Sequence, residues 1–260
     1  MNDQHHKTAL ITGASSGLGA EFARQLATRG HDLILVARRR DRLAALAEEL
    51  SGRHGITAEP LTADLADPAG IAQVAAYIAG LPRLDLLVNN AGFGIGGAFA
   101  EADVAGQADM LHVHMMAPMR LSHAALPGMI ARRSGGIINV ASVAAFVALP
   151  GDANYCATKA YLVTFSQALA METRRYGVRV QALRPGFTVT EFHDHTDRVG
   201  FDRNASPRFL WGPASAVVTA SLRGLERGQV ICVPGFLNRV IMLLARTGLV
   251  NRLAPLVLRK

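Results

Sequence analysis

Residues 9–19 read Ala-Leu-Ile-Thr-Gly-Ala-Ser-Ser-Gly-Leu-Gly, and this stretch decides the fold. Its first four residues form a run typical of a β-strand, and apolar residues then recur at helical spacing from Leu18 to Leu26. We therefore predict a strand, a glycine-rich turn and the beginning of a helix. Such a turn can bind a pyrophosphate, because glycines let the backbone approach closely and the positive end of the helix dipole faces the anion. The glycine spacing differs from the usual G-x-G-x-x-G, so a tight turn without a ligand stays an alternative.

Strand-like runs alternate with helix-like segments along the whole chain. The runs cover Thr8–Thr12, Leu33–Ala37, Thr57–Leu61, Leu84–Asn89, Ile137–Ala141, Val178–Leu183 and Val230–Val233. Alternating strands and helices form right-handed βαβ crossovers around a parallel sheet. The pattern predicts an α/β fold of Rossmann type, a doubly wound parallel sheet of about seven strands with helices on both faces. A chain of 260 residues can bury one large core, so we expect residues 1–260 to form a single domain.

Composition and charge narrow the class of protein. The net charge of +7 is spread among many arginines, without basic runs interleaved with aromatic residues, so we predict no nucleic-acid partner. The only cysteines, Cys156 and Cys232, are too few for a disulfide framework and lack metal-ligand spacing, so we predict no metal site. Residues 1–7 lack the apolar core of a signal peptide, and no apolar run is long enough to cross a bilayer. We expect a cytoplasmic protein.

Three polar residues in the second half of the chain form a candidate catalytic group. Tyr155 and Lys159 stand four residues apart in a segment, 154–176, that has helical character, so both side chains lie on one helix face. A lysine ammonium near a phenol favours the phenolate and lowers a pKa that begins near ~10. Ser142 follows an apolar strand-like run, where an open α/β sheet presents residues to ligands. We interpret Tyr155 as an acid or base and Ser142 as a group that binds a carbonyl or alcohol oxygen.

Taken together, these motifs resemble the classical short-chain dehydrogenase/reductase family over about residues 7–235. The resemblance implies that Ser142 orients the reacting oxygen, Tyr155 exchanges the proton, and Lys159 lowers the tyrosine pKa and holds the nicotinamide ribose. It also implies a cofactor site that includes Tyr155 and Lys159 and is otherwise formed by Gly13, Ser15, Ser16, Gly17, Leu18, Gly19, Asp64, Leu65, Asn90, Ala91, Gly92, Pro185, Gly186, Thr188 and Thr190.

The end of the second predicted strand indicates which dinucleotide is bound. A site that prefers NAD usually has Asp or Glu there, to bind the ribose hydroxyls, whereas this chain has Ala37. Three arginines follow, of which Arg38 is our predicted ligand of the extra phosphate of NADP(H), with Ser15 as a nearby donor. A solvated basic beginning of the next helix is the alternative.

One position departs from the family pattern. The resemblance places an asparagine on the fourth helix, where it supports a water in the proton relay, and His114 stands there instead. Pro118 cannot donate the N–H that would normally bind the carbonyl of residue 114, so we expect that carbonyl to accept a hydrogen bond from a water. Whether the His114 side chain takes part in catalysis stays open, and a partly buried helix histidine without a catalytic role is the alternative.

Two further segments have predicted roles. Residues 187–213 lack clear periodicity, and the resemblance implies that they close the substrate pocket. The segment 236–260 is basic and amphipathic, and it could pack on another subunit or make weak contact with an anionic membrane surface. We expect a homodimer or homotetramer. Aromatic and apolar residues predicted to line the pocket suggest an apolar substrate; they are Phe93, Phe146, Leu149, Phe187, Phe192 and Trp211.

The function predicted from these features is an NADP(H)-dependent reductase or dehydrogenase. It would interconvert a carbonyl and an alcohol on a small molecule. A non-catalytic NADP(H) sensor or scaffold on the same fold is one alternative, because fold alone does not determine function. A peripheral membrane protein is another. The presence of Ser142, Tyr155 and Lys159 argues against the sensor, since a sensor needs no proton donor.

Overall fold

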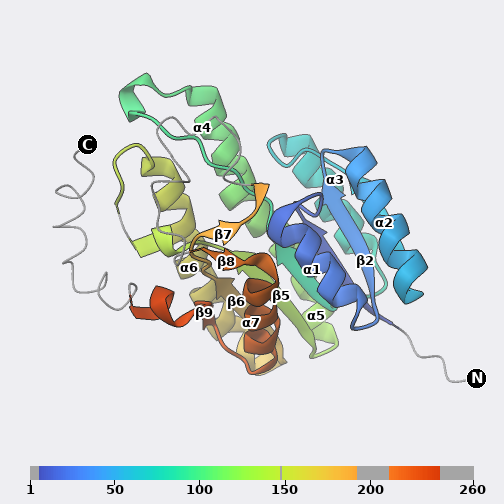
Figure 1. Ribbon diagram of the computed structural model, residues 1–260. Helices are drawn as coiled ribbons and strands as arrows, with labels where there is room; N and C mark the ends of the chain where they lie inside the picture. Colours follow the sequence, from blue (N-terminus) through green and yellow to red (C-terminus); the bar gives the residue numbers. More distant parts are fainter. Residues whose placement is uncertain (1–5, 147, 192–210, 241–260) are drawn as a thin grey trace, which may run out of the picture.

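The central feature of the protein is a seven-stranded parallel sheet, seen in a computed structural model that describes residues 6–146, 148–191 and 211–240 (Figure 1). Its strands are β1 (Lys7–Thr12), β2 (His31–Ala37), β3 (Ala58–Thr62), β4 (Leu86–Asn89), β5 (Gly135–Val140), β6 (Val178–Leu183) and β9 (Ile231–Cys232). They lie in the order β3-β2-β1-β4-β5-β6-β9, and every neighbouring pair is parallel. The predicted doubly wound parallel sheet is confirmed.

The strand order reverses between β1 and β4, and this reversal positions the site. The chain moves outward from β1 to β3 in one direction and from β4 to β9 in the other. The connections after β1 and after β4 therefore leave opposite faces of the sheet, so a crevice forms beyond their carboxyl ends. Ligands of open α/β sheets bind in such a crevice.

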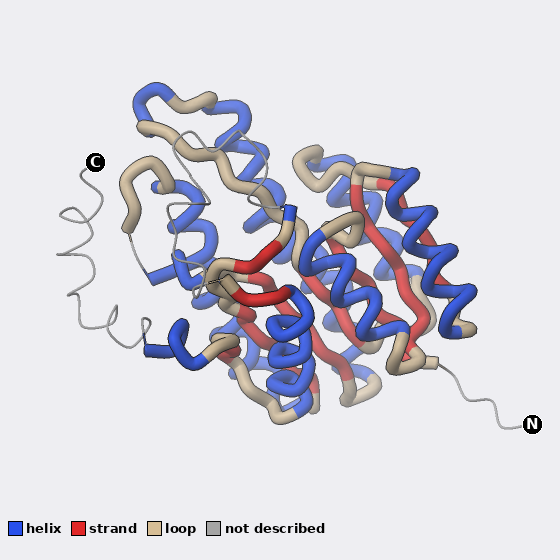
Figure 2. Tube along the Cα trace, in the orientation of Figure 1, coloured by secondary structure: helices blue, strands red, loops and turns tan. Residues whose placement is uncertain are grey.

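Helices cover both faces of the sheet, as predicted (Figures 1 and 2). One layer contains α1 (Gly17–Ala27), α2 (Arg40–His54) and α7 (Ala214–Glu226), whose residues Phe22, Leu43 and Leu222 share one buried core. The opposite layer contains α3 (Pro68–Gly80), α5 (Ala117–Ala131) and α6 (Ala153–Thr173), whose residues Ile71, Leu121 and Leu169 share a second core. The central strands β2, β4 and β5 are therefore buried on both sides, which explains why they are apolar runs without alternation, whereas the edge strand β3 is half-buried or exposed throughout.

The remaining elements are short. In the described residues, 3₁₀ turns occur at Phe99–Glu101, Val143–Phe146 and Arg174–Tyr176, and α4 (Val104–Leu111) leads into a π-helical turn at His112–Met116. The helix predicted over 154–176 corresponds to α6 and the 3₁₀ turn after it, which ends at Gly177 with φ +73°. No helix in the described part of the chain is both long enough and apolar enough to span a bilayer.

Several strand ends are shifted from the predicted ones: β4 begins at Leu86 instead of Leu84, and β5 begins at Gly135 instead of Ile137. β9 has two residues instead of four, because it pairs at the sheet edge only with the last two residues of β6. A second parallel sheet, β7 (Thr188–Val189) with β8 (Gly212–Pro213), joins the two ends of the predicted substrate segment. The π-turn also has no signal in the apolar pattern; there the Ala117 N–H bonds the carbonyl of His112, five residues earlier, just before Pro118.

Candidate active site

The glycine turn between β1 and α1 is tightly packed against the loop after β4. Gly13 has φ +66°, and a Cβ on it would lie 2.8 Å from the Ala91 Cα. A Cβ on Gly19 would lie 2.2 Å from the Gly13 carbonyl oxygen. Neither position can therefore accept a larger residue without movement of the backbone. The turn ends at the N-terminus of α1, where unpaired N–H groups and the helix dipole favour an anion.

Thr12 ties this turn to the segment after β4, a contact that sequence reasoning did not identify. The Thr12 Oγ1 accepts the N–H groups of Asn90 at 2.9 Å and Ala91 at 3.0 Å. In return, the Asn90 Nδ2 donates to the Thr12 carbonyl at 2.8 Å. The predicted cofactor residues Asn90 and Ala91 thus lie directly beside the glycine turn, and a Cβ on Gly92, the next residue, would lie 2.8 Å from the His114 Nε2.

Tyr155 and Lys159 occupy the first two turns of α6, and both are buried. The Lys159 Nζ donates to the carbonyl of Val140, the last residue of β5, at 3.0 Å. The same Nζ lies 5.6 Å from the centroid of the Tyr155 ring. The strand end therefore holds the ammonium group near the Tyr155 ring.

Ser142 lies two residues beyond β5, at the beginning of the turn Val143–Phe146. Its Oγ accepts the N–H of Ala144 at 3.1 Å, and its carbonyl accepts the N–H of Ala145 at 3.2 Å. The N–H of Val143 donates to the Pro185 carbonyl at 3.0 Å, so the segment after β6 lies beside Ser142. The predicted catalytic residues thus gather at the carboxyl ends of β5 and β6.

His114 is buried in the π-turn and is bonded through both ring nitrogens. The backbone N–H of Phe93 donates to its Nε2 at 3.1 Å, which requires that Nε2 carry no proton. Its Nδ1 lies 3.0 Å from the Thr158 Oγ1, which itself donates to the Tyr155 carbonyl at 2.9 Å. The imidazole is therefore the neutral tautomer with the proton on Nδ1. It connects the loop after β4 to the helix of Tyr155, whose ring centroid lies 5.8 Å away.

Arg38 and Arg39, the first two arginines after β2, have different contacts. Arg38, the predicted phosphate ligand, has a side chain that is 70% exposed and lies 3.9 Å from the Asp64 carboxylate. Arg39, which was not singled out from the sequence, donates to the Ser15 Oγ at 3.1 and 3.0 Å and to the Ser16 Oγ at 2.7 Å. Both serines belong to the glycine turn. The guanidinium closest to that turn is therefore Arg39, and the only sequence signal for it was its place in the run of three arginines.

The other predicted cofactor residues surround the same crevice. Asp64 and Leu65 follow β3, where the Asp64 Oδ1 accepts the N–H of Ala66 at 3.0 Å. The segment after β6 returns to the glycine turn, because a Cβ on Gly17 would lie 3.2 Å from the Thr190 Cβ. The remaining predicted positions in these segments are Leu18, Pro185, Gly186 and Thr188, and the Thr188 Oγ1 donates to the Gly186 carbonyl at 3.0 Å.

Aromatic residues predicted to line a pocket occur in pairs near this crevice. The Phe187 and Trp211 rings stack with centroids 5.2 Å apart. The Phe146 ring lies 3.1 Å from the guanidinium carbon of the buried Arg184, and Phe93 contacts the ring of His114 edge-on. Leu149 is half-buried. Phe192 and most of the predicted substrate segment lie outside the described residues, as does most of the segment 236–260.

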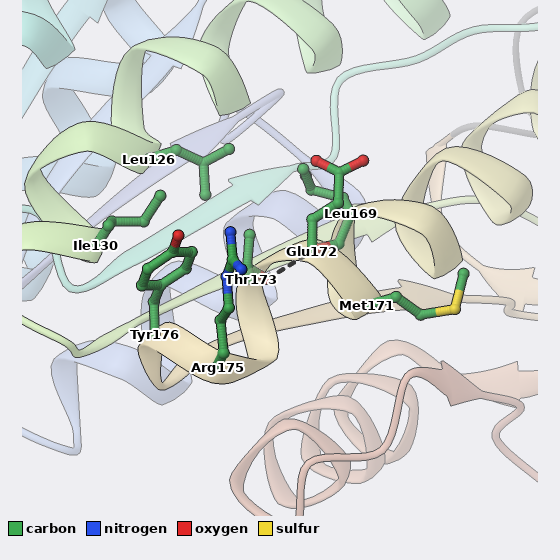
Figure 3. A pocket seen from close by; sticks show the side chains of 8 residues that line it. All are labelled: Leu126, Ile130, Leu169, Met171, Glu172, Thr173, Arg175 and Tyr176. Atoms are coloured by element: carbon green, nitrogen blue, oxygen red, sulfur yellow. Dashed lines mark hydrogen bonds between the residues drawn. The ribbon is translucent and has the colours of Figure 1, made fainter.

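A separate hollow of about 430 Å³ lies at the opposite end of α6 (Figure 3). Leu126 and Ile130 of α5 face Arg175 and Tyr176 across it. Tyr155 lies near the beginning of the 21-residue helix α6, about 27 Å from this end at 1.5 Å per residue. The hollow is therefore separate from the group around Tyr155. Among the described residues, no group of three or more His, Cys, Asp or Glu side chains could hold a metal ion.

Comparison with known proteins connects this geometry to a family. The family model described as short chain dehydrogenase matches residues 7–198. An uncharacterized oxidoreductase of Bacillus subtilis (strain 168), YmfI, is 33% identical over 240 residues, which cover 88% of this chain and 98% of that protein.

Solved structures give the same result. A short-chain dehydrogenase from Sphingobium yanoikuyae in complex with NADPH is 37% identical, with a TM-score of 0.83 and 94% of each chain covered. The bulky-bulky ketone specific alcohol dehydrogenase from Comamonas testosteroni is 32% identical, with a TM-score of 0.78 and 94% of this chain and 93% of that chain covered. These similarities support an oxidoreductase that acts on CH–OH groups with a nicotinamide cofactor, and they do not favour a non-catalytic sensor or a membrane protein. The chain therefore belongs to the classical short-chain dehydrogenase/reductase family.

Proposed function

We propose that this protein is an NADP(H)-dependent oxidoreductase that interconverts a carbonyl and an alcohol on an apolar small molecule. The observation that carries the proposal is the placement of Lys159. Its buried Nζ is held by the Val140 carbonyl at 3.0 Å and lies 5.6 Å from the centroid of the Tyr155 ring. A cation next to a phenol stabilises the phenolate, so Tyr155 can both give and accept a proton near neutral pH.

The residues of the crevice fit a dinucleotide. Gly13 and Gly19 leave bare backbone at two positions of the turn, and the N-terminus of α1 faces the space beside it. Tyr155 and Lys159 lie in the first two turns of α6, where the Lys159 Nζ reaches the carboxyl end of β5 and a nicotinamide ribose could contact both side chains. A bound nicotinamide supplies the hydride for reduction or accepts it in oxidation.

The side chains of this chain move and position the proton. In the direction of reduction, the Tyr155 hydroxyl donates its proton to the carbonyl oxygen, and Lys159 stabilises the phenolate that remains. Ser142 donates a hydrogen bond to the same oxygen and thereby holds the substrate in place. In the direction of oxidation, the phenolate removes the proton of the alcohol.

The preference for NADP(H) rests on charge at the end of β2. Ala37, the last residue of β2, offers no carboxylate to the ribose hydroxyls, whereas Arg38 and Arg39 follow directly. Arg39 already bonds Ser15 and Ser16, so its guanidinium is positioned for a phosphate that these hydroxyls would also bind. The Sphingobium yanoikuyae relative, whose solved structure contains NADPH, supports this choice.

The substrate is proposed to be apolar and bulky. Phe93, which contacts the ring of His114, and the stacked pair Phe187 and Trp211 are aromatic side chains available to such a substrate. The Comamonas testosteroni relative is specific for bulky-bulky ketones, which favours ketones with two large substituents as the first compounds to test. We also propose a single domain, a cytoplasmic location and a homodimer or homotetramer.

The experiment is a comparison of wild-type protein with Tyr155→Phe. NADPH oxidation is followed at a series of ketones, with NADH in parallel, and NADPH binding is measured by fluorescence. We expect turnover with NADPH to fall by about 10²- to 10⁴-fold in Tyr155→Phe, the usual contribution of a general acid, while NADPH binding changes little. A Tyr155→Phe variant with turnover within a few-fold of wild type would contradict the assignment.

A further inference from the structure

Glu191, at the end of the described part of the substrate segment, pairs with two arginines of the region around α2. Its Oε2 lies 3.3 Å from the Arg39 Nη1. Its two carboxylate oxygens also accept hydrogen bonds from the Arg42 Nη1 at 2.9 and 2.8 Å. Arg39 lies directly before α2 and Arg42 in its first turn, so the ion pair joins segments about 150 residues apart.

Of these two arginines, Arg39 also contacts the glycine turn. Arg39 bonds Ser15 and Ser16 through its Nε and Nη2, and Glu191 through its Nη1. Thr190, the neighbour of Glu191, packs against Gly17 of the turn. The carboxylate is therefore positioned beside the group proposed to hold the adenosine phosphate, not at an unrelated point of the surface.

The charge of Glu191 opposes that phosphate. Hydrogen bonding from Arg42, followed by Arg39, holds the pKa of Glu191 below its ordinary value, so the carboxylate is ionised at neutral pH. An anion within hydrogen-bond distance of Arg39 competes with a phosphate for the same guanidinium, and two like charges close together repel. The pyrophosphate site at the beginning of α1 lacks this competition, because Glu191 pairs with the arginines and not with the backbone of the turn.

We infer that Glu191 is a specificity-determining residue that acts as a built-in competitor for the 2′-phosphate of NADP(H). It lowers the affinity for NADP(H) and leaves the affinity for NAD(H) unchanged. It therefore reduces the preference for NADP(H) over NAD(H) that Arg38 and Arg39 create. When the phosphate binds, the bond between Glu191 and Arg39 is exchanged for one between the phosphate and Arg39. This inference rests on the proposed use of NADP(H).

The test measures binding, independent of turnover, on full-length protein. Isothermal titration with NADPH, NADH, 2′,5′-ADP and 5′-AMP is compared between wild type, Glu191→Gln and Glu226→Gln. Glu226, the last residue of α7, is the matched control. It also forms an exposed ion pair with an arginine, Arg29, at 2.7 Å, but away from the turn. Since exposed ion pairs have modest energies, we expect Glu191→Gln to bind NADPH and 2′,5′-ADP about 2- to 5-fold more tightly. NADH and 5′-AMP binding should stay the same, and Glu226→Gln should behave as wild type.

The same titrations in an Arg39→Met protein test whether Glu191 acts through Arg39. In Arg39→Met, the preference for NADPH over NADH should fall, and the gain from Glu191→Gln should disappear, because the two residues act on the same phosphate. If Glu191→Gln tightens NADH and NADPH equally, or changes neither while wild type still prefers NADPH, the inference is wrong and the proposed cofactor stands. If wild type binds NADPH no better than NADH, the proposed NADP(H) preference is itself wrong, and the inference falls with it.

Discussion

The His114 side chain, which replaces the family's asparagine, is held by hydrogen bonds at both ring nitrogens. Its Nε2 accepts the Phe93 N–H, and its Nδ1 donates to the Thr158 hydroxyl, so both nitrogens are used. A protonated imidazole would have no lone pair for Phe93. The ring thus holds the loop after β4 against the helix that carries Tyr155. These contacts favour a positioning role for the side chain, and the expected water on its carbonyl stays a prediction.

Removing the imidazole should therefore weaken the site without ending the chemistry. We expect His114→Ala to lower the free energy of unfolding by about 1–3 kcal/mol, because the part-buried Phe93 N–H loses its acceptor and the buried Thr158 hydroxyl loses one of its two partners. Turnover should fall less than in Tyr155→Phe. Unfolding in urea and the pH profile of turnover measure both effects.

His112→Ala is the matched control for this prediction. His112 belongs to the same π-turn, and its Nδ1 lies 2.8 Å from the Ala66 carbonyl, a contact to the segment after β3. We expect the His112→Ala variant to be less stable than wild type, with little change in turnover per folded molecule. A His114→Ala enzyme as inactive as Tyr155→Phe would show instead that the imidazole itself carries the proton relay.

At the scale of elements, the packing of β1, the glycine turn and α1 decides which glycines are essential. Gly19 lies on the first turn of α1 and faces the backbone of Gly13, whereas Gly52 lies in α2 with open space around it. The same residue type thus has opposite meaning in two neighbouring helices. The difference arises because the turn before α1 packs against Gly19, whereas no atom lies within 4 Å of a Cβ on Gly52.

The two positions make a paired test. We expect Gly19→Ala to reduce cofactor binding strongly and to destabilise the fold, because its Cβ would lie 2.2 Å from the Gly13 oxygen. Gly52→Ala should stabilise the protein by about 0.5–1 kcal/mol, because alanine is the better helix former. Thermal unfolding and NADPH titration of both variants check this. A Gly19→Ala protein that binds NADPH as wild type does would contradict the close packing described above.

At the scale of the whole molecule, Asp85 joins three central strands at the amino edge of the sheet. Its carboxylate accepts the N–H of Thr8 at 2.9 Å and two hydrogen bonds from the Arg83 Nε at 2.9 Å. Its backbone bonds Thr8 and Gly136. Burial alone would raise the pKa of Asp85, but the bonds from Arg83 and Thr8 hold it below its ordinary value. The ionised form therefore stabilises the fold.

Stability should depend on pH through this group. Its contribution is complete above the ordinary aspartate pKa of ~3.9 and is lost as the pH falls through the lowered pKa of the folded state. We expect Asp85→Asn to cost about 1–3 kcal/mol near pH 6, and less as the pH falls below about 4. Urea unfolding from pH 6 to pH 3 measures the difference. Asp109, exposed on α4, is the control, and Asp109→Asn should show no such trend; an Asp85→Asn cost that is constant with pH would contradict this account.

Local patterns in the sequence determined the sheet and the catalytic pair. Alternating apolar runs and helical segments predict a parallel sheet, because each strand buried on both faces must be apolar and each crossover needs a helix. The spacing of Tyr155 and Lys159 determines their shared helix face through helix geometry alone. These features depend on neighbours in the chain, so they can be predicted without the tertiary structure.

Only the tertiary structure decided which side chains meet across the crevice. Arg39, not Arg38, reaches Ser15, and Glu191 pairs with Arg39 from 152 residues away. The partners of His114 lie 21 and 44 residues from it. Such contacts depend on how separate loops are brought together at the carboxyl ends of the strands, and on which way each side chain then points. Neither property is encoded in the spacing of neighbouring residues, because the packing of the whole sheet determines both.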